Sequence, residues 1–226
     1  MARTRSQKFP QIQRTILKRA AAVFAERGYS TSSMADLTRA TKLSRGALYH
    51  YFSSKEAILS GILEDHVSLF LERIEATLAV AADPAQQLRQ VTRAIVALNT
   101  QCPQEQTLLL NELNQLSSPV RRKVEALERR ILDLLSELLE RVDTGGRITA
   151  GNRRVHTMIF LGIVNYTFAW YDPKGRVSPE EYAELAVDVF LHGFIRSPAP
   201  NSRVAPARRA TPARTNGVAR AASEER

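Results

Sequence analysis

The stretch SRGALYHYFSSKE (Ser44–Glu56) places three aromatic rings and an imidazole on four consecutive residues, Tyr49, His50, Tyr51 and Phe52. Residues next to each other in a helix do not share a face, because the residues three and four apart are the ones that lie together. The four rings therefore cannot all be buried, and some of them must face outward. The function of this segment depends on what the outward rings contact.

Helical spacing divides the stretch into two faces. Leu48 and Phe52 are four residues apart and are expected to face inward, with Tyr51 on their flank. The residues left outside are Arg45, Gly46, Tyr49 and His50. We expect Tyr51 and Phe52 to pack onto the helix that begins near Ser54, and Tyr49 and His50 to contact nucleic acid phosphates and sugars. The open alternative is that all the rings serve only packing.

Three short helices are expected in about the first 52 residues: one between Pro10 and Gly28, one from Met34 to Thr41 and one from Arg45 to Tyr51. Ser33 and Asp36 have the spacing of a capping box, and Ser44 is placed to cap the third helix. Lys42 and Leu43 complete the short turn between the second and third helices. This arrangement predicts a helix-turn-helix that fits the major groove of DNA, with capped helix ends that attract phosphate.

The positive charge is concentrated at the two ends of the 226-residue chain. Residues 1–55 hold eleven basic and two acidic side chains, and residues 197–226 hold six basic and two acidic ones. The residues between them are mildly acidic, and the net charge of the whole chain is +9. Such a distribution indicates a polyanionic partner for the N-terminal segment, although a merely solvated basic end would look the same. The single cysteine, Cys102, fits a reducing compartment. We find no signal peptide and no membrane span, and expect a cytoplasmic protein.

Helical spacing continues to about residue 195, and no alternating strand pattern is present. We expect an all-α fold of about nine helices, with the later ones at about 54–79, 84–102, 108–116, 119–142, 152–171 and 178–195. The predicted domains are a helix-turn-helix domain at 1–55 and a helical bundle at 56–196. Residues 197–226, rich in Pro, Ala, Arg and Ser, are predicted to form a disordered basic tail.

The segment from about residue 11 to 60 resembles the DNA-binding segment of the TetR family of transcriptional regulators. The resemblance rests on AAAVFAERGY, the Thr/Ser cluster after it, the short Met34–Thr41 helix, and LSRGALYHYFSSKE. One departure from the family pattern is Leu37-Thr38-Arg39-Ala40, a segment in which family members more often have an Ile-Ala pair. The resemblance implies a dimeric repressor of a palindromic operator that is released by a small molecule. It implies DNA contacts at Ser33, Arg45, Gly46, Tyr49, His50 and Lys55. We also expect Ser44, at the start of the third helix, and Lys42 to contact DNA, Lys42 through a flanking phosphate.

The C-terminal bundle is expected to hold the effector and to form the dimer. Polar or aromatic residues on apolar helix faces are the candidate effector ligands: His66, Phe70, Asn111, Asn165, Phe168 and Trp170. Each of them is also explained by an ordinary core position, but together they predict a mostly apolar cavity. The last two helices are expected to pair with a second copy, with Ala183, Ala186 and Gly193 allowing close approach and Phe190 and Phe194 as anchors. The core of a monomer would give the same pattern of small and aromatic residues along the last helix.

The ending TFAWYDPKGRVSPEEYAELAVDVFLHG resembles that of family members responding to acyl-CoA thioesters of fatty-acid, steroid or aromatic degradation. The CoA phosphates would need basic residues at the entrance of the cavity. Candidates are Arg121, Arg122 and Lys123, or Arg153 and Arg154, although such runs of basic residues also occur on solvent-exposed helix faces. We find no catalytic motif, no metal-ligand spacing and no cofactor motif. The alternatives are a small enzyme without a recognisable motif and a helical interaction module.

Overall fold

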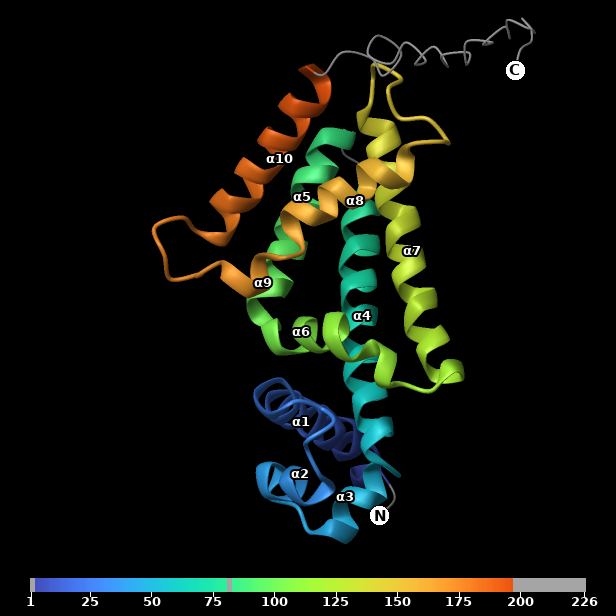
Figure 1. Cartoon of the computed structure of the whole chain (residues 1–226), viewed down its shortest axis with the longest axis vertical. Helices are drawn as coiled ribbons and strands as arrows, with labels where there is room; N and C mark the ends of the chain where they lie inside the picture. The colour runs from blue at the N-terminus through green and yellow to red at the C-terminus, as the bar shows by residue number, and fades with distance from the viewer. Residues whose placement is uncertain (1–2, 81–82, 197–226) are drawn as a thin grey trace, which may run out of the picture. The chain divides into compact units, whose positions relative to one another are not determined.

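A computed structural model describes residues 3–80 and 83–196, and the expected disordered tail at 197–226 lies outside these residues. Within the described ranges the regular structure is entirely helical, which agrees with the predicted all-α fold (Figure 1). The helices are α1 (Arg3–Arg27), α2 (Met34–Thr41), α3 (Arg45–Tyr51), α4 (Lys55–Leu78), α5 (Pro84–Gln101), α6 (Pro103–Glu112), a 3₁₀ turn (Leu113–Gln115), α7 (Ser118–Val142), α8 (Arg153–Val164), α9 (Thr167–Trp170) and α10 (Pro179–Arg196).

The helix starts follow the local capping signals. The backbone N–H of Ser33 donates to Asp36 Oδ2 at 2.9 Å and the Asp36 N–H donates to Ser33 Oγ at 3.2 Å, so the predicted capping box is confirmed. Ser44 Oγ accepts from the Ala47 N–H at 3.2 Å and caps α3. Ser178 and Glu181 form the same reciprocal pair at the start of α10.

Two helix starts were predicted wrongly because of prolines. α1 begins at Arg3 and contains Pro10, whose fixed φ is helical although its ring removes one backbone hydrogen bond and crowds the preceding turn. α6 begins at Pro103, well before the predicted Leu108, because proline suits the first helical position, where its N–H would have no partner.

The helix predicted at 152–171 is interrupted, so one expected helix becomes α8 and α9. Asn99 on α5 explains the break. Its Nδ2 donates to the Val164 carbonyl at 3.1 Å and to Thr167 Oγ1 at 3.1 Å, with the Asn165 carbonyl at 3.4 Å. Asn99 is completely buried, so these bonds are shielded from water and end α8 at a defined residue.

The buried side chains form two clusters, and α4 belongs to both. The first cluster packs α1, α2 and α3 around the beginning of α4 and includes Phe24, Leu37, Leu48 and Leu59. It also takes in residues of α6 and α7, such as Leu108, so packing is continuous across residue 55. The second cluster surrounds the end of α4 with side chains of α5, α7, α8 and α10. In Figure 1 α4 runs from the small N-terminal helices into the bundle.

α10 packs Ala183 and Ala186 against its own chain, whereas Gly193, the third small residue expected at a dimer interface, is exposed. Ala183, Ala186 and Phe190, expected at a dimer interface, are buried within the monomer, and Phe190 packs against Phe160 with ring centroids 5.3 Å apart. Their assignment to a dimer interface is therefore wrong, and the alternative of a monomeric core applies to them. The Phe194 side chain lies outside the described residues. The opposite face of α10 exposes Leu185 and Val189, each more than half accessible.

Candidate nucleic-acid interface and effector cavity

The outer face of α3 is polar and open. Arg45, Gly46, Tyr49 and His50 are all exposed, whereas Leu48 is completely buried beneath them. The Arg45 guanidinium lies 5.7 Å from the centre of the Tyr49 ring, close enough for a cation–π contact that holds both side chains on this face. A Cβ built at Gly46 meets no atom within 4 Å, so a partner can approach the α3 backbone at this position.

The remaining rings of α3 pack as expected, but with an additional partner. Tyr51 and Phe52 are partly buried against the first core cluster. Phe9 of α1 lies 4.7 Å from the Tyr51 ring and 5.9 Å edge-on from the His50 ring. Phe9 thus orients His50 while leaving it exposed. Sequence reasoning did not identify Phe9, because it precedes the proline at which the first helix was expected to start.

The N-termini of α2 and α3 differ in charge. At α2, hydrogen bonds from Ser33 and the contact with Arg39 hold the pKa of the Asp36 carboxyl at about 2, so a carboxylate already occupies this helix end. No acidic residue lies in the first turn of α3. A phosphate near Ser44 would therefore meet backbone amides at the positive end of α3 without a competing anion. Near Ser33, the Asp36 carboxylate already occupies the corresponding place at α2.

Lys55 has a structural role that the sequence did not reveal. Its ammonium donates to the carbonyls of Tyr29 at 2.8 Å and Ser32 at 2.9 Å, with the Ser30 carbonyl at 3.4 Å, and lies 4.3 Å from the centre of the Tyr29 ring. These carbonyls belong to the segment between α1 and α2. In this structure Lys55 joins the start of α4 to that segment, in place of the outward orientation that a phosphate contact requires.

The turn before α3 is held from α1. Arg19 donates to the carbonyl of Thr41 at 2.9 Å, at the end of α2. The next residue, Lys42, has φ 59° and an exposed side chain. The left-handed conformation turns the chain sharply into α3, so Lys42 lies beside the exposed face of α3.

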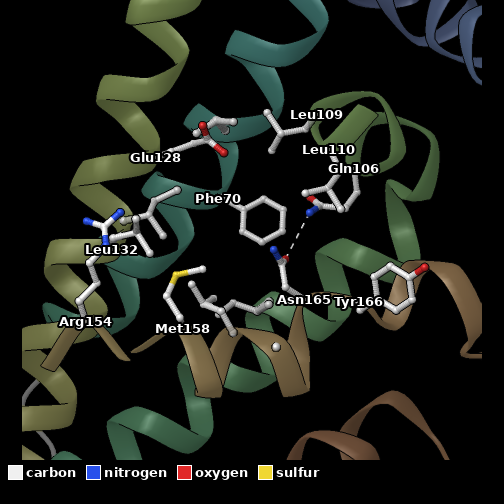
Figure 2. A pocket seen from close by; sticks show the side chains of 15 residues that line it. Phe70, Gln106, Leu109, Leu110, Glu128, Leu132, Arg154, Met158, Asn165 and Tyr166 are labelled. Carbon is white, nitrogen blue, oxygen red and sulfur yellow. Dashed lines mark hydrogen bonds between the residues drawn. The ribbon is translucent and has the colours of Figure 1, made fainter. Parts of the chain in front are cut away.

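A cavity of about 410 Å³ lies in the helical bundle, beside the end of α4. Most of its wall is apolar, and the polar lining residues are Gln106, Glu128, Arg154, Asn165 and Tyr166. Figure 2 shows Phe70 of α4, Glu128 of α7 and Asn165 at the end of α8 around the same space. Burial raises the pKa of the Glu128 carboxyl, and the nearby Glu125 raises it further. The wall therefore favours an apolar guest with few polar groups.

The structure brings two of the six predicted effector residues, Phe70 and Asn165, to this cavity. His66 is buried behind it and contacts the cavity residue Gln106, with His66 Nε2 2.8 Å from Gln106 Oε1. Asn111 lies on the exposed face of α6, outside the cavity.

The other two candidates belong to an aromatic group at α9. The Phe168 and Tyr166 rings lie 5.4 Å apart, and only Tyr166 lines the cavity. Trp170 is 61% exposed and packs beside Tyr182. The break after α8 moves both residues away from the face they would occupy in a continuous helix.

Among the candidate basic residues, only Arg154 lines the cavity. Arg153 pairs with Glu140 at 3.6 Å, and Arg121 pairs with Glu125 at 3.2 Å. Three polar residues of the wall, Gln106, Glu128 and Tyr166, were not predicted from the sequence. Gln106 carried a detectable signal, a polar residue one helical turn before the apolar pair Leu109 and Leu110, but that signal is also common on exposed helices.

Within residues 3–80 and 83–196, no group of three or more His, Cys, Asp or Glu side chains is arranged to hold a metal ion. No helix in the same part of the chain has the length and apolar content needed to cross a bilayer.

Within the described residues, the helical fold with a capped helix-turn-helix, a basic N-terminal segment and a separate apolar cavity is typical of DNA-binding regulators. Residues 16–62 match the family description "Bacterial regulatory proteins, tetR family", and residues 81–194 match "Tetracyclin repressor-like, C-terminal domain". The chain belongs to the TetR family of transcriptional regulators.

Individual relatives agree with this assignment. A TetR-family regulator from Bordetella parapertussis is 34% identical, with 83% of this chain and 97% of that one covered and a TM-score of 0.75. AibR, solved with isovaleryl coenzyme A and operator DNA, is 28% identical, with 79% and 97% covered and a TM-score of 0.70. The transcriptional repressor KstR2 of Mycolicibacterium smegmatis is 23% identical over 80% of this chain and 90% of its own.

The family assignment decides between the functions that the sequence left open. The protein is a DNA-binding transcriptional repressor that binds operator DNA through its helix-turn-helix. The family consists of regulators without enzymatic activity, so the alternative of a small enzyme is wrong.

Proposed function

We propose that this repressor acts in the cytoplasm as a homodimer on a palindromic operator and is released by an effector with an apolar acyl or aryl group, an acyl-CoA thioester. The observation that carries the proposal is the position of the cavity. Phe70 on its wall belongs to α4, the same helix whose first half shares the first core cluster with Leu48 of α3. An effector beside Phe70 thus contacts an element that also supports the DNA-reading helix.

An exposed apolar face supports the homodimer. Val155 and Ile159 on α8 and Leu185 and Val189 on α10 are each more than half accessible. Four large apolar side chains exposed on two helices are more than scattered surface residues explain, and a second copy would cover them. Two recognition helices about 34 Å apart can then read a palindrome.

Cavity size and charge support the acyl-CoA class. A volume of about 410 Å³ is near the small end of the range for ligand sites, so it suits an acyl or aryl group without the nucleotide of CoA. Arg154 on the wall is the residue placed to meet the phosphates that remain outside. The relative AibR was solved with an acyl-CoA, which favours this class over a free acid.

The proposal is tested with DNA fragments that the purified protein retains from genomic DNA. Once sequencing gives the operator, gel-shift titrations compare an acyl-CoA series, the corresponding free acids and CoA alone. We expect acyl-CoAs alone to release the operator at micromolar concentrations. Release by free acids to the same extent would contradict the thioester assignment, and operators without two-fold symmetry would contradict the dimer.

A further inference from the structure

The polar end of the cavity is built from a chain of three side chains on three helices. His66 Nε2 of α4 lies 2.8 Å from Gln106 Oε1 of α6, and Gln106 Nε2 donates to Asn165 Oδ1, at the end of α8, at 3.3 Å. His66 and Gln106 are almost completely buried, whereas Asn165 is partly accessible. The chain therefore runs from the interior of the bundle to the cavity surface.

The direction of these hydrogen bonds decides what the cavity offers a ligand. Gln106 Oε1 can only accept, so His66 Nε2 carries the proton, and burial lowers the pKa of His66 and favours this neutral form. Gln106 uses its amide group to donate to Asn165 Oδ1. The remaining group at the cavity surface is the Asn165 amide nitrogen, which Figure 2 shows turned toward the Phe70 ring. The chain thus ends in a hydrogen-bond donor facing an apolar space.

We infer that Asn165 reads an uncharged carbonyl group of the effector: its Nδ2 donates to a carbonyl oxygen attached to the apolar part seated in the cavity. This inference rests on the proposed function and specifies the recognised group. A carboxylate fits the position poorly, because its nearest side chains are amides and the neutral His66, and the wall also carries Glu128. An ionised group buried without a cation would lose its hydration without compensation.

The spacing along α8 agrees with a thioester. Arg154 and Asn165 both line the cavity and are eleven residues apart, about 16 Å along a helix. A ligand whose carbonyl meets Asn165 would therefore have to extend about this distance to place a phosphate at Arg154. A carbonyl joined to a long arm that carries a phosphate satisfies both ends, whereas a free fatty acid, whose carboxylate can pair with Arg154, has no uncharged carbonyl for Asn165.

The inference is tested with two matched pairs of probes. The first pair is octanoyl-CoA and S-octyl-CoA, a thioether in which a methylene replaces the carbonyl. The second is benzophenone and diphenylmethane, an uncharged ketone and the corresponding hydrocarbon. Isothermal titration calorimetry on the wild-type dimer should show that at least one carbonyl compound binds about tenfold more tightly than its partner, as expected for one hydrogen bond in a site shielded from water.

Two variants locate the source of this preference. Asn165→Leu removes the amide oxygen and nitrogen together, and Asn165→Asp replaces the N–H donor with a carboxylate oxygen, so neither variant should bind the carbonyl compound more tightly than its partner. Asn111→Leu is the matched control: its asparagine is exposed and lies outside the cavity, so the preference should stay. Thermal unfolding identifies which of the two Asn165 variants is folded and interpretable.

Equal binding of both members in each pair by the wild type, a preference that survives in a folded Asn165 variant, or no binding of any probe would overturn the inference. Operator release is measured separately. If the carbonyl preference depends on Asn165 but no probe releases DNA, the proposed effector response fails while the carbonyl recognition stands. A preference for benzophenone over diphenylmethane without one for octanoyl-CoA over S-octyl-CoA would likewise support carbonyl recognition by Asn165 but contradict an acyl-CoA as the effector.

Discussion

Replacing Lys55 with methionine should destabilise the protein without removing a DNA contact. Met keeps the apolar stem but loses the ammonium that donates to the Tyr29 and Ser32 carbonyls and lies over the Tyr29 ring. A charge-assisted hydrogen bond contributes about 1.5–3 kcal/mol. Water can reach this partly exposed segment and replace part of the loss, so we expect a decrease in the free energy of unfolding of about 2 kcal/mol. For a chain of this size the decrease corresponds to a Tm lower by about 4–8 °C.

Salt dependence separates this structural role from a phosphate contact. If Lys55 bound phosphate, Lys55→Met would reduce the slope of log K against log salt by about 0.9 per protein copy. We expect that slope to stay at the wild-type value when operator binding is measured at a temperature at which the variant is folded. Lys42→Met is the matched control, because Lys42 is exposed beside α3, and there we expect the slope to decrease. An unchanged stability for Lys55→Met, or a slope reduced as in the control, would refute the reasoning.

Three further outcomes are expected. Tyr49→Ala should weaken specific operator binding at least about tenfold, as gel shifts would show, while changing stability by less than about 0.5 kcal/mol, because Tyr49 is 41% exposed; a weakened dimer instead would count against a DNA contact. Leu185→Glu, on the exposed face of α10, should give monomers in sedimentation velocity runs where Lys174→Glu, on an exposed turn, does not. His66→Gln should reduce the acid sensitivity of unfolding: burial lowers the pKa of His66, so its stabilising effect is complete above about pH 6.5 and is lost as the pH falls through the lowered value. An identical pH profile for wild type and variant in urea would contradict this role.

The features that the sequence predicted well depend on neighbouring residues. The capping box of Ser33 and Asp36, the cap at Ser44, and the burial of Leu48 beneath an exposed Tyr49 all involve residues within one or two helical turns. Spacing and side-chain chemistry determine such contacts almost regardless of the rest of the chain. For this reason the helix-turn-helix is recognisable in the amino-acid sequence alone.

The features that were missed depend on distant partners. Asn99 ends α8 from another helix, and the sequence around residue 165 contains no break signal as strong as a proline. Lys55 resembles a solvent-exposed base, yet the segment after α1 supplies carbonyls that bind it. Asn111 and Asn165 are both asparagines among apolar residues, and only the packing of α6 and α8 decides which one reaches the cavity. Periodicity identifies the face of a helix but not what that face meets.

In the proposed effector response, α4 and α6 are the helices that connect the cavity with the DNA-binding helices. α4 extends for 24 residues, about 36 Å, with Leu59 in the core beneath α3 and Phe70 on the cavity wall. α6 carries Gln106 on the same wall, while its Leu108 is buried in the cluster that contains Ile16 of α1.

Both helices therefore contact the cavity on one side and the DNA-binding helices on the other. Tightly packed cores shift between discrete arrangements and do not deform gradually, so we expect a displacement of either helix to reach the core that supports α3. An effector that fitted the cavity equally well in the DNA-bound and released arrangements of these two helices would not relieve repression, however tightly it bound.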